Sequence, residues 1–271
     1  MKLVVCAKEV LDPDAVNSYA LAGRLTIGAD GRTLTQSAIP RLINGYDEQA
    51  IEAALRIRDA GAPAAIHVVS VGRELSNLLR HASALGADEV AEIALDAPDP
   101  DVHVIARILA AYVRNIGGAD LVLCGRQASD DDQGVVPALI GEALGMPVVT
   151  VARSIELDRG TDPPTARIVR VTPDGDQTVE VRGPAVVTIS SELGAPRYPT
   201  AARKLAARRV KPRALTPAEL GLAEAELTPA LTLVRRFVPE LQGKCEFLEG
   251  ANPAELADRL IARLRQDGVL S

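Results

Sequence analysis

The chain has 271 residues, enough for one large α/β domain or for one domain with an extended appendage. Hydrophobic residues make up 47% of it and charged residues 24%, which is ordinary for a soluble globular protein. The net charge of −6 argues against nucleic-acid binding by the whole molecule, and the 2% aromatic content without Trp argues against a base-stacking surface.

Cysteine and histidine spacing gives no sign of a metal centre. Cys6, Cys124 and Cys245 are far apart, no C-x-x-C pair occurs, and the three histidines show no ligand spacing. Between Lys2 and Lys8 there are only five apolar residues, too few for a signal peptide or a membrane span. We therefore expect buried free thiols, a cytoplasmic or matrix-like compartment, and no membrane insertion.

The first half of the chain alternates between strand and helix patterns. Lys2–Val10 is a short apolar run that predicts a first buried parallel strand. Leu11–Ile39 has two turn-rich patches, PDAVNS and GADGRT, and is expected to form a hairpin or excursion rather than a helix. Asn44–Asp59 has apolar residues at helical spacing behind an Asn/Asp start, which predicts an amphipathic helix.

The same alternation continues as far as the middle of the chain. Further strands are predicted at Ala64–Val71, Glu89–Leu95 and Asp120–Cys124, and helices at Leu75–Leu85, at Val102–Asn115 and from near Val135. This order predicts an α/β fold with a doubly wound, mostly parallel sheet and helices on both faces.

After Met146 the character of the sequence changes. Antiparallel strands are expected at Val148–Glu156, Thr165–Val171 and Thr178–Val181, with turns at Gly160–Pro164 and Pro173–Gly175, followed by a buried strand at Pro184–Ser190. Pro196–Pro217 holds seven basic and no acidic residues, which is typical of a solvated face. The alternative interpretations are a docking arm for an acidic partner and a contact with phosphate. Ala218–Phe247 is rich in turns and is expected to form a mobile or partner-wrapping tail. The apolar spacing of Asn252–Asp267 predicts a closing amphipathic helix.

The stretch Leu121–Gly145 carries the clearest functional signal. An apolar strand passes through Gly125 and three aspartates into a helix with Pro137 in its first turn. A strand, glycine turn and helix in this order place backbone N–H groups and a helix N-terminus at the carboxyl end of a sheet, where anionic ligands bind. The pattern predicts a nucleotide-binding edge.

Three other segments also end at the carboxyl edge of the predicted sheet. They are Cys6–Lys8, Asn44–Asp47 and Val71–Gly72. If they meet the loop Gly125–Val136 in one crevice, backbone groups at Cys6 and Val71 could hold a base while the amides from Gln127 to Val136 hold phosphate. Each loop taken alone is explained as well by simple turn chemistry.

The aspartates Asp130, Asp131 and Asp132 need a separate explanation, because carboxylates repel phosphate. One could cap the following helix, one could accept from a ribose hydroxyl and one could face water; a catalytic acid pair or a magnesium site is the alternative. The sequence lacks a P-loop, a G-x-G-x-x-G turn and a G-x-S-x-G elbow. Without a nucleophile and base pair, it indicates binding rather than catalysis.

Several motifs in order resemble one family, the beta subunits of electron transfer flavoproteins, including their nitrogen-fixation-associated relatives. The resemblance is carried by VVCAKEV, NGYDEQAIEAAL, VVSVG, LLRHASALGADE, LVLCGRQASDDDQGVVPALIGEALGMP, VEVRGPAVVTISSELGAPRYPT and LEGANPAELADRLIARLRQDGV. It covers nearly the whole chain.

The resemblance implies a non-catalytic electron carrier that forms a heterodimer with an alpha subunit, which holds most of the redox-active FAD. The beta subunit completes that site and binds AMP structurally, or a second FAD in electron-bifurcating members. It further implies dehydrogenases and a quinone reductase as redox partners. The implied division is an adenine-nucleotide-binding α/β domain at 1–195, then a docking loop, partner-wrapping arm and C-terminal helix at 196–271.

The resemblance also implies which residues bind. The nucleotide site would comprise Cys6, Asn44, Gly45, Tyr46, Asp47, Val71, Gly125, Arg126, Gln127, Ala128, Ser129, Asp130, Asp131, Asp132, Gln133, Gly134 and Val135. The partner-docking loop would comprise Pro196, Arg197, Tyr198, Pro199, Thr200 and Ala201. The loop after the aspartates is one residue shorter than the family pattern, and Ala201 and Ala202 replace an expected leucine and proline. A stand-alone adenine-nucleotide sensor or hydrolase of the same fold is the remaining alternative.

Overall fold

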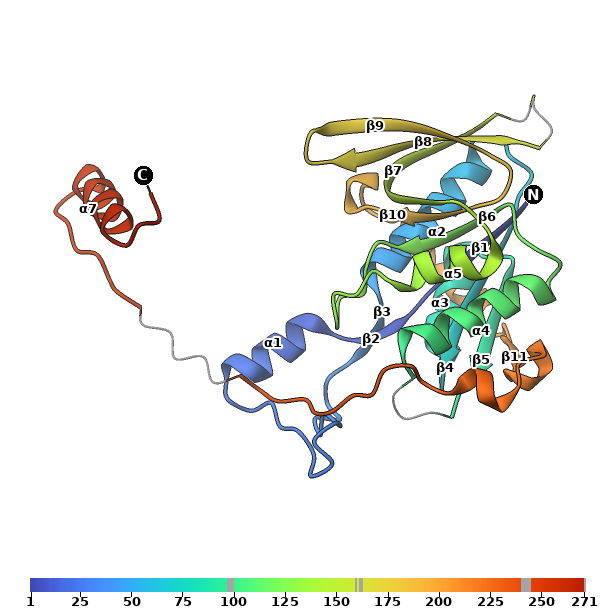
Figure 1. Ribbon diagram of the computed structural model, residues 1–271, viewed down its shortest axis with the longest axis horizontal. Helices are drawn as coiled ribbons and strands as arrows, with labels where there is room; N and C mark the ends of the chain where they lie inside the picture. The colour runs from blue at the N-terminus through green and yellow to red at the C-terminus, as the bar shows by residue number, and fades with distance from the viewer. Residues whose placement is uncertain (97–99, 159, 161–162, 240–244, 271) are drawn as a thin grey trace. The chain divides into compact units, whose positions relative to one another are not determined.

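A nine-stranded sheet forms the centre of residues 1–236 (Figure 1). In this computed structural model residues 1–96, 100–158, 160, 163–239 and 245–270 are described. They belong to two compact units, Met1–Arg236 and Phe237–Ser271, which we describe separately. The predicted functional division at residues 195 and 196 stays a prediction.

The sheet has the strand order β11-β5-β4-β1-β6-β10-β7-β8-β9. Seven neighbouring strands are parallel, and β8 and β9 extend the sheet in antiparallel fashion beyond β7. The strands are β1 (Lys2–Cys6), β4 (Ala65–Gly72), β5 (Glu89–Ala94), β6 (Leu121–Gly125), β7 (Val148–Asp158), β8 (Thr165–Thr172), β9 (Gly175–Arg182), β10 (Ala185–Ile189) and β11 (Arg213–Leu215). The predicted doubly wound, mostly parallel sheet with antiparallel strands is confirmed.

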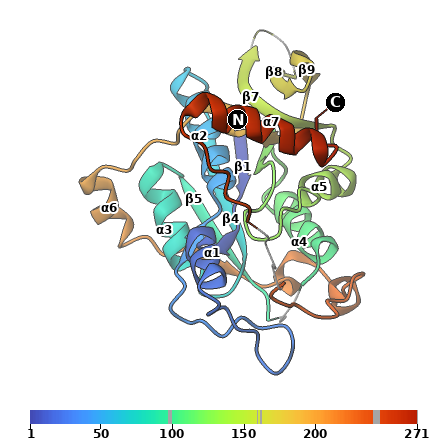
Figure 2. The same ribbon diagram turned by 90° about the vertical axis from the view of Figure 1, so that its left-hand side faces the viewer.

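Helices cover both faces of the sheet (Figure 2). On one face lie α2 (Gly45–Asp59) and α3 (Ser76–Leu85), and on the other α4 (Val102–Asn115) and α5 (Val136–Leu144). Because successive strand residues point to opposite faces, Leu3 and Val5 of β1 pack with the first pair of helices while Val4 and Cys6 pack with the second. Burial on both faces explains why these strands read as continuous apolar runs.

The prediction that Leu11–Ile39 contains no helix is wrong. After β2 (Glu9–Leu11), the helix α1 (Pro13–Leu21) forms because the Asp12 side chain accepts from the N–H groups of Asp14 and Ala15, with Pro13 in the first turn. The predicted first strand correspondingly divides into β1 and β2, and β2 pairs with β3 (Arg41–Ile43). The second turn-rich patch does reverse the chain, with an isolated bridge between Ile27 and Leu34.

The segment after β10 packs onto the sheet more than its turn-rich sequence suggests. The helix α6 (Ala201–Ala207) leads to β11, an edge strand that the sequence did not reveal, and two 3₁₀ turns follow at Ala218–Leu220 and Glu224–Leu227. The Asp101 carboxylate caps α4 and accepts from the N–H groups of Ala230 and Leu231. Part of the predicted tail, residues 240–244, and part of the predicted turn, residues 161–162, lie outside the described residues.

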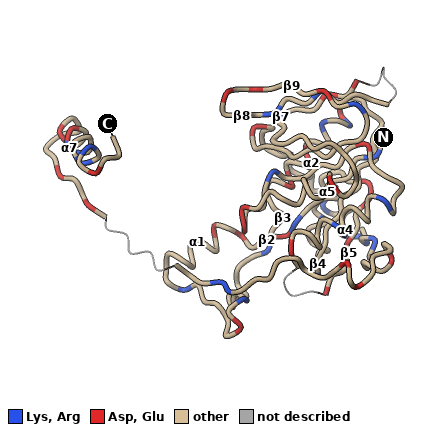
Figure 3. Tube along the Cα trace, in the orientation of Figure 1, with Lys and Arg blue, Asp and Glu red and all other residues tan. Residues whose placement is uncertain are grey.

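The unit that begins at Phe237 contains the helix α7 (Pro253–Gln266), which confirms the predicted closing helix. Asn252 accepts from the Glu255 N–H as its N-cap, and Leu260 and Ile261 are exposed. None of the helices in the described part of the chain is both long and apolar enough to cross a bilayer. Figure 3 shows acidic and basic positions interspersed along the chain in this view.

Candidate functional site

The buried amide of Asn44 joins the start of α2 to the loop after β6. Its Nδ2 donates to the Gln127 carbonyl at 2.9 Å, and its Oδ1 accepts from the Ser129 N–H at 3.2 Å. The residue is 1% exposed and makes no capping bond to its own helix. Two segments 83 residues apart are therefore held together by one side chain, as the predicted crevice requires.

Asp47 ties the same helix to the ends of two central strands. Its Oδ1 accepts from the Gly125 N–H at 2.9 Å and its Oδ2 from the Lys8 N–H at 2.8 Å. The carboxyl is 7% exposed, and burial raises its pKa to about 6 although hydrogen bonds from Lys8, Asn44 and Gly125 lower it. Asp47 thus fixes β1, β6 and α2 at one point of the carboxyl edge.

Two glycines permit the close approach of these segments. A Cβ on Gly125 would lie 2.5 Å from Asp47 Oδ1 and 2.7 Å from the Tyr46 carbonyl carbon. A Cβ on Gly134 would lie 2.6 Å from the Arg126 carbonyl oxygen. Real Cβ atoms do not come so near, so the sequence requires glycine at both ends of the loop.

The loop from Gln127 to Val135 folds back on itself. The Asp132 N–H donates to the Ala128 carbonyl, the Gln127 side chain donates to the Asp132 carboxylate, and Asp132 has a φ of +54°. Contrary to the suggestion that an aspartate caps the next helix, the N-cap of α5 is Val135 and no side chain caps it. The start of α5 therefore has no side-chain cap for the N–H groups of Val135 and Val136, whereas Pro137 carries no N–H and the Ala138 N–H donates to the Val135 carbonyl.

Lys8 offsets part of the negative charge of this loop. Its Nζ lies 2.7 Å from Asp130 Oδ1 and 3.1 Å from Asp131 Oδ2. The sequence pattern does not indicate a role for this ammonium group, although Lys8 stands two residues beyond Cys6 at a predicted strand end. The ion pairs reduce the repulsion that the aspartates would otherwise exert on a phosphate.

Arg126 and Tyr46 lie side by side at the same edge. The Arg126 guanidinium carbon is 5.0 Å from the centroid of the Tyr46 ring, within the range of a cation–π interaction. The Arg126 N–H donates to the Ile189 carbonyl, which brings the end of β10 to the loop. Gly45 precedes Tyr46 as the first residue of α2.

Cys6 and Val71 occupy the neighbouring strand ends. Cys6 pairs in register with Val69 of β4, so Val71 lies two residues further along the same edge. The apolar Val71 side chain takes no part in the Asn44 and Asp47 hydrogen bonds, and Val71 pairs in register with Ile93 of β5. Most predicted nucleotide residues thus meet around Asn44 and Asp47.

The predicted docking segment forms a separate group. The Arg197 guanidinium binds the Glu52 carboxylate through Nε at 2.7 Å and Nη2 at 3.2 Å, and it also lies 2.7 Å from Asp59. These ion pairs raise the pKa of Arg197. Tyr198 beside it is 92% exposed. The remaining members are Pro196, Pro199, the α6 N-cap Thr200 and Ala201, the first residue of α6.

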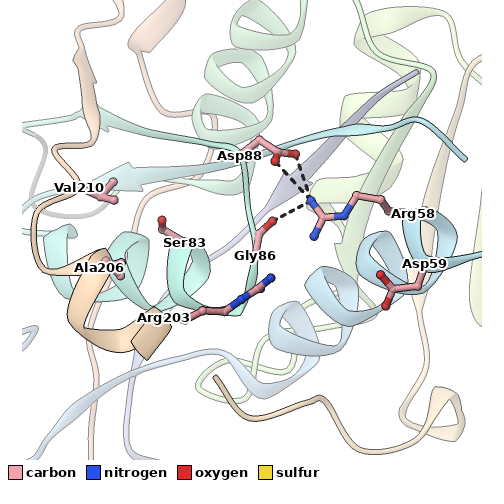
Figure 4. A pocket seen from close by; sticks show the side chains of 9 residues that line it. Arg58, Asp59, Ser83, Gly86, Asp88, Arg203, Ala206 and Val210 are labelled. Atoms are coloured by element: carbon pink, nitrogen blue, oxygen red, sulfur yellow. Dashed lines mark hydrogen bonds and ion pairs between the residues drawn. The ribbon is translucent and has the colours of Figure 1, made fainter. Parts of the chain in front are cut away.

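A hollow of about 560 Å³ lies near the carboxyl end of α2, apart from the predicted nucleotide residues (Figure 4). Arg58 donates to the Gly86 carbonyl and pairs with Asp88, while Arg203 donates to the Leu85 carbonyl. Both arginines are therefore engaged in fastening α2 and α6 to the end of α3. Among the described residues, no group of three or more His, Cys, Asp or Glu side chains could hold a metal ion.

Comparison with known proteins assigns the fold to a family. Residues 32–215 match the family described as electron transfer flavoprotein domain. The caffeyl-CoA reductase-Etf complex subunit CarD of Acetobacterium woodii is 30% identical over the whole of both chains. The electron transfer flavoprotein subunit beta of Bacillus subtilis is 31% identical over 83% of this chain and 86% of its own length. The subunit beta of Clostridium acetobutylicum is 30% identical over 98% of this chain and 99% of its own length. The chain therefore belongs to the electron transfer flavoprotein family, in its beta-subunit branch.

Proposed function

We propose that this chain is the beta subunit of a heterodimeric electron transfer flavoprotein and binds AMP structurally at the carboxyl edge of its sheet. The observation that carries the proposal is the network in which Asn44 and Asp47 hold Lys8, Gly125, Gln127 and Ser129 together. It contains no nucleophile and base pair. A binding role fits the family better than a catalytic role on this chain.

Different groups of the chain would bind different parts of the nucleotide. Backbone groups at Cys6 and Val71 would meet the base, since the two residues lie at the carboxyl ends of the neighbouring strands β1 and β4. The loop amides up to Val135 and the uncapped start of α5 would meet the phosphate. Lys8, held near Asp130 and Asp131, would share its positive charge with that phosphate.

The FAD of the complex would be held mainly by an alpha subunit and completed by this chain. The flavin would supply the electron-transfer chemistry, and this chain would supply binding and orientation. Tyr46 and Arg126 offer an aromatic face and a cation at the edge of the crevice.

Partner docking would involve Pro196–Ala201. Arg197 is fixed to α2 by Glu52 and Asp59, so the exposed Tyr198 projects from an anchored segment. Rigid exposed aromatics are frequent anchors of interfaces. Dehydrogenases and a quinone reductase are the proposed redox partners of the complex, and the basic residues of α6 would speed encounters with acidic surfaces at low salt.

A second candidate is a subunit of a larger reductase complex. The full-length similarity to a subunit named for a caffeyl-CoA reductase-Etf complex supports it. In that case the crevice of this chain would hold a second FAD, as in a bifurcating complex, and the chain would work with a CoA-ester reductase instead of docking transiently.

The test is to co-express the chain with an electron transfer flavoprotein alpha subunit and to identify the nucleotides released on denaturation by chromatography and mass spectrometry. The proposal expects one AMP and one FAD per heterodimer. Two FAD and no AMP would replace it with the second candidate. Absence of any adenine compound, or a homo-oligomer that binds or hydrolyses ATP without a partner, would contradict both.

A further inference from the structure

Two buried cysteines are neighbours in the central strands of the sheet. Cys6 of β1 and Cys124 of β6 are direct register partners in a parallel pair. Neighbouring strands lie about 4.8 Å apart, and register partners point to the same face of a sheet. This separation falls inside the range of about 4.4–6.8 Å between the Cα atoms of disulfide-bonded cysteines.

The two thiols lie in the same buried environment on one face of the sheet. Both belong to the core cluster on the side of α4 and α5, and they are 7% and 4% exposed. The neighbouring Cys6 thiol, together with burial, raises the pKa of the Cys124 thiol. Cys124 is therefore a thiol rather than a thiolate near neutral pH, which makes it a slow nucleophile.

We propose that Cys6 and Cys124 form an oxidisable dithiol that closes to an intramolecular disulfide under a small hydroperoxide. Neither residue has a redox role in the proposed function. One sulfur attacks the peroxide, the O–O bond breaks, water leaves and a sulfenic acid forms. The second sulfur attacks the first, the S–O bond breaks and a second water leaves. Two thiols and one hydrogen peroxide thus give one disulfide and two waters.

The position of the pair links it to the crevice. Cys124 immediately precedes Gly125, whose N–H binds Asp47, and Cys6 lies at the adjacent strand end. A nucleotide over these strand ends would cover the route of the oxidant to Cys6, so we expect bound AMP to slow the reaction. This protection rests on the proposed function, whereas disulfide formation does not.

The exposed Cys245 must be removed before the pair can be measured. The test uses the full-length chain with Cys245→Ser, treated with hydrogen peroxide, and counts thiols after denaturation. We expect both remaining thiols to disappear, the mass to fall by two hydrogens, a linked Cys6–Cys124 peptide to appear in a non-reducing digest, and dithiothreitol to restore both thiols. Addition of oxygen atoms without a linked peptide, or survival of both thiols at a peroxide concentration that fully oxidises Cys245 in the parent chain, would overturn the proposal.

A second part of the experiment distinguishes disulfide formation from AMP binding at the crevice. Cys124→Ala in the same background removes the partner, and Cys6 should then gain oxygen instead of losing hydrogen. AMP at saturating concentration should slow the disappearance of the two thiols at least several-fold. If the disulfide forms at the same rate with and without AMP, the dithiol stands while AMP binding at this edge fails.

Discussion

The buried carboxyl of Asp47 combines a structural role with an unusual proton affinity. It joins three segments of the crevice, yet burial raises its pKa from 3.8 to about 6. A proton is therefore bound more tightly by the folded chain than by the unfolded chain. The stabilisation from this proton is complete below about pH 4 and is lost as the pH rises through 6.

Comparison with Asp47→Asn tests this pH dependence of stability, because the variant cannot titrate at residue 47. The unfolding free energy of the parent chain, measured relative to that of the variant, should fall by about 2.4 kcal/mol between pH 4 and pH 7, because each pKa unit corresponds to about 1.36 kcal/mol and most of the titration lies in this range. Urea denaturation at several pH values measures the difference. A difference that stays constant across this range would show that Asp47 titrates normally in the folded chain.

In the docking segment, Arg197 binds the buried Glu52 carboxylate. Glu52 is only 5% exposed, and burial raises its pKa, but hydrogen bonds from Arg197 and Arg56 outweigh this and leave the pKa lowered. Arg197→Ala removes two of the charged hydrogen bonds and leaves the buried carboxylate with Arg56. We expect a loss of about 1–3 kcal/mol in unfolding free energy, between the values for exposed and buried pairs.

The matched control for Arg197 is Arg153→Ala. Arg153 pairs with Asp176 at the surface, with both side chains nearly half exposed, so its loss should cost less than about 1 kcal/mol. Urea denaturation of both variants gives the comparison. Equal losses would mean that Arg197 contributes no more than an ordinary surface ion pair.

Among the elements, the close contact of α2 with the end of β6 depends on Gly125. Gly125→Ala places a methyl group 2.5 Å from the Asp47 carboxylate and against the Tyr46 backbone, so the helix or the strand must move. We expect a loss of about 1–3 kcal/mol in stability and a clear weakening of AMP binding, measured by urea denaturation and calorimetric titration.

Gly45→Ala is the control for that substitution, because a Cβ there meets nothing within 4 Å and its φ is not positive. It should leave stability unchanged or raise it by up to about 1 kcal/mol, since alanine favours the helix. A Gly125→Ala variant as stable as Gly45→Ala would show that α2 and β6 are not in the tight contact described.

The elements that the sequence predicted well are those with strong apolar periodicity. The helix α4 matches its predicted bounds, and β4, β5 and β6 differ from theirs by a residue or so, because buried strands and amphipathic helices have distinct patterns. The helix α1 was missed because Asp12 and Pro13 suit a turn as well as a helix start. The edge strand β11 has only three residues, too few for a pattern.

For the site, too, the sequence predicted the features that have a local pattern and missed those that do not. Position at strand ends predicted that Asn44, Asp47 and Gly125 would lie near one another, and they do. The pairing of individual atoms could not be predicted, because Asn44 looked like an ordinary helix cap and Lys8 like a charge that ends a strand. Those contacts join residues more than 75 positions apart, and nothing in local sequence encodes them.

In the molecule as a whole, α2 connects the two proposed functions of the chain. Its first turn carries Asn44 and Asp47 at the crevice, and its later turns carry Glu52 and Asp59, which hold Arg197. A helix rises about 1.5 Å per residue, so the crevice and the docking anchor are held at a fixed separation by one rigid element. The nucleotide would thereby help to order the helix that carries the docking segment.

Amide hydrogen exchange of the full-length chain with and without AMP tests the proposed nucleotide site most directly. Occupation of the carboxyl edge predicts slower exchange in residues 125–135 and 44–47, and unchanged exchange in the antiparallel strands β8 and β9. Unchanged exchange in the loop 125–135, or protection centred on the hollow beside Arg58 and Arg203, would contradict the proposal that this edge is the nucleotide site.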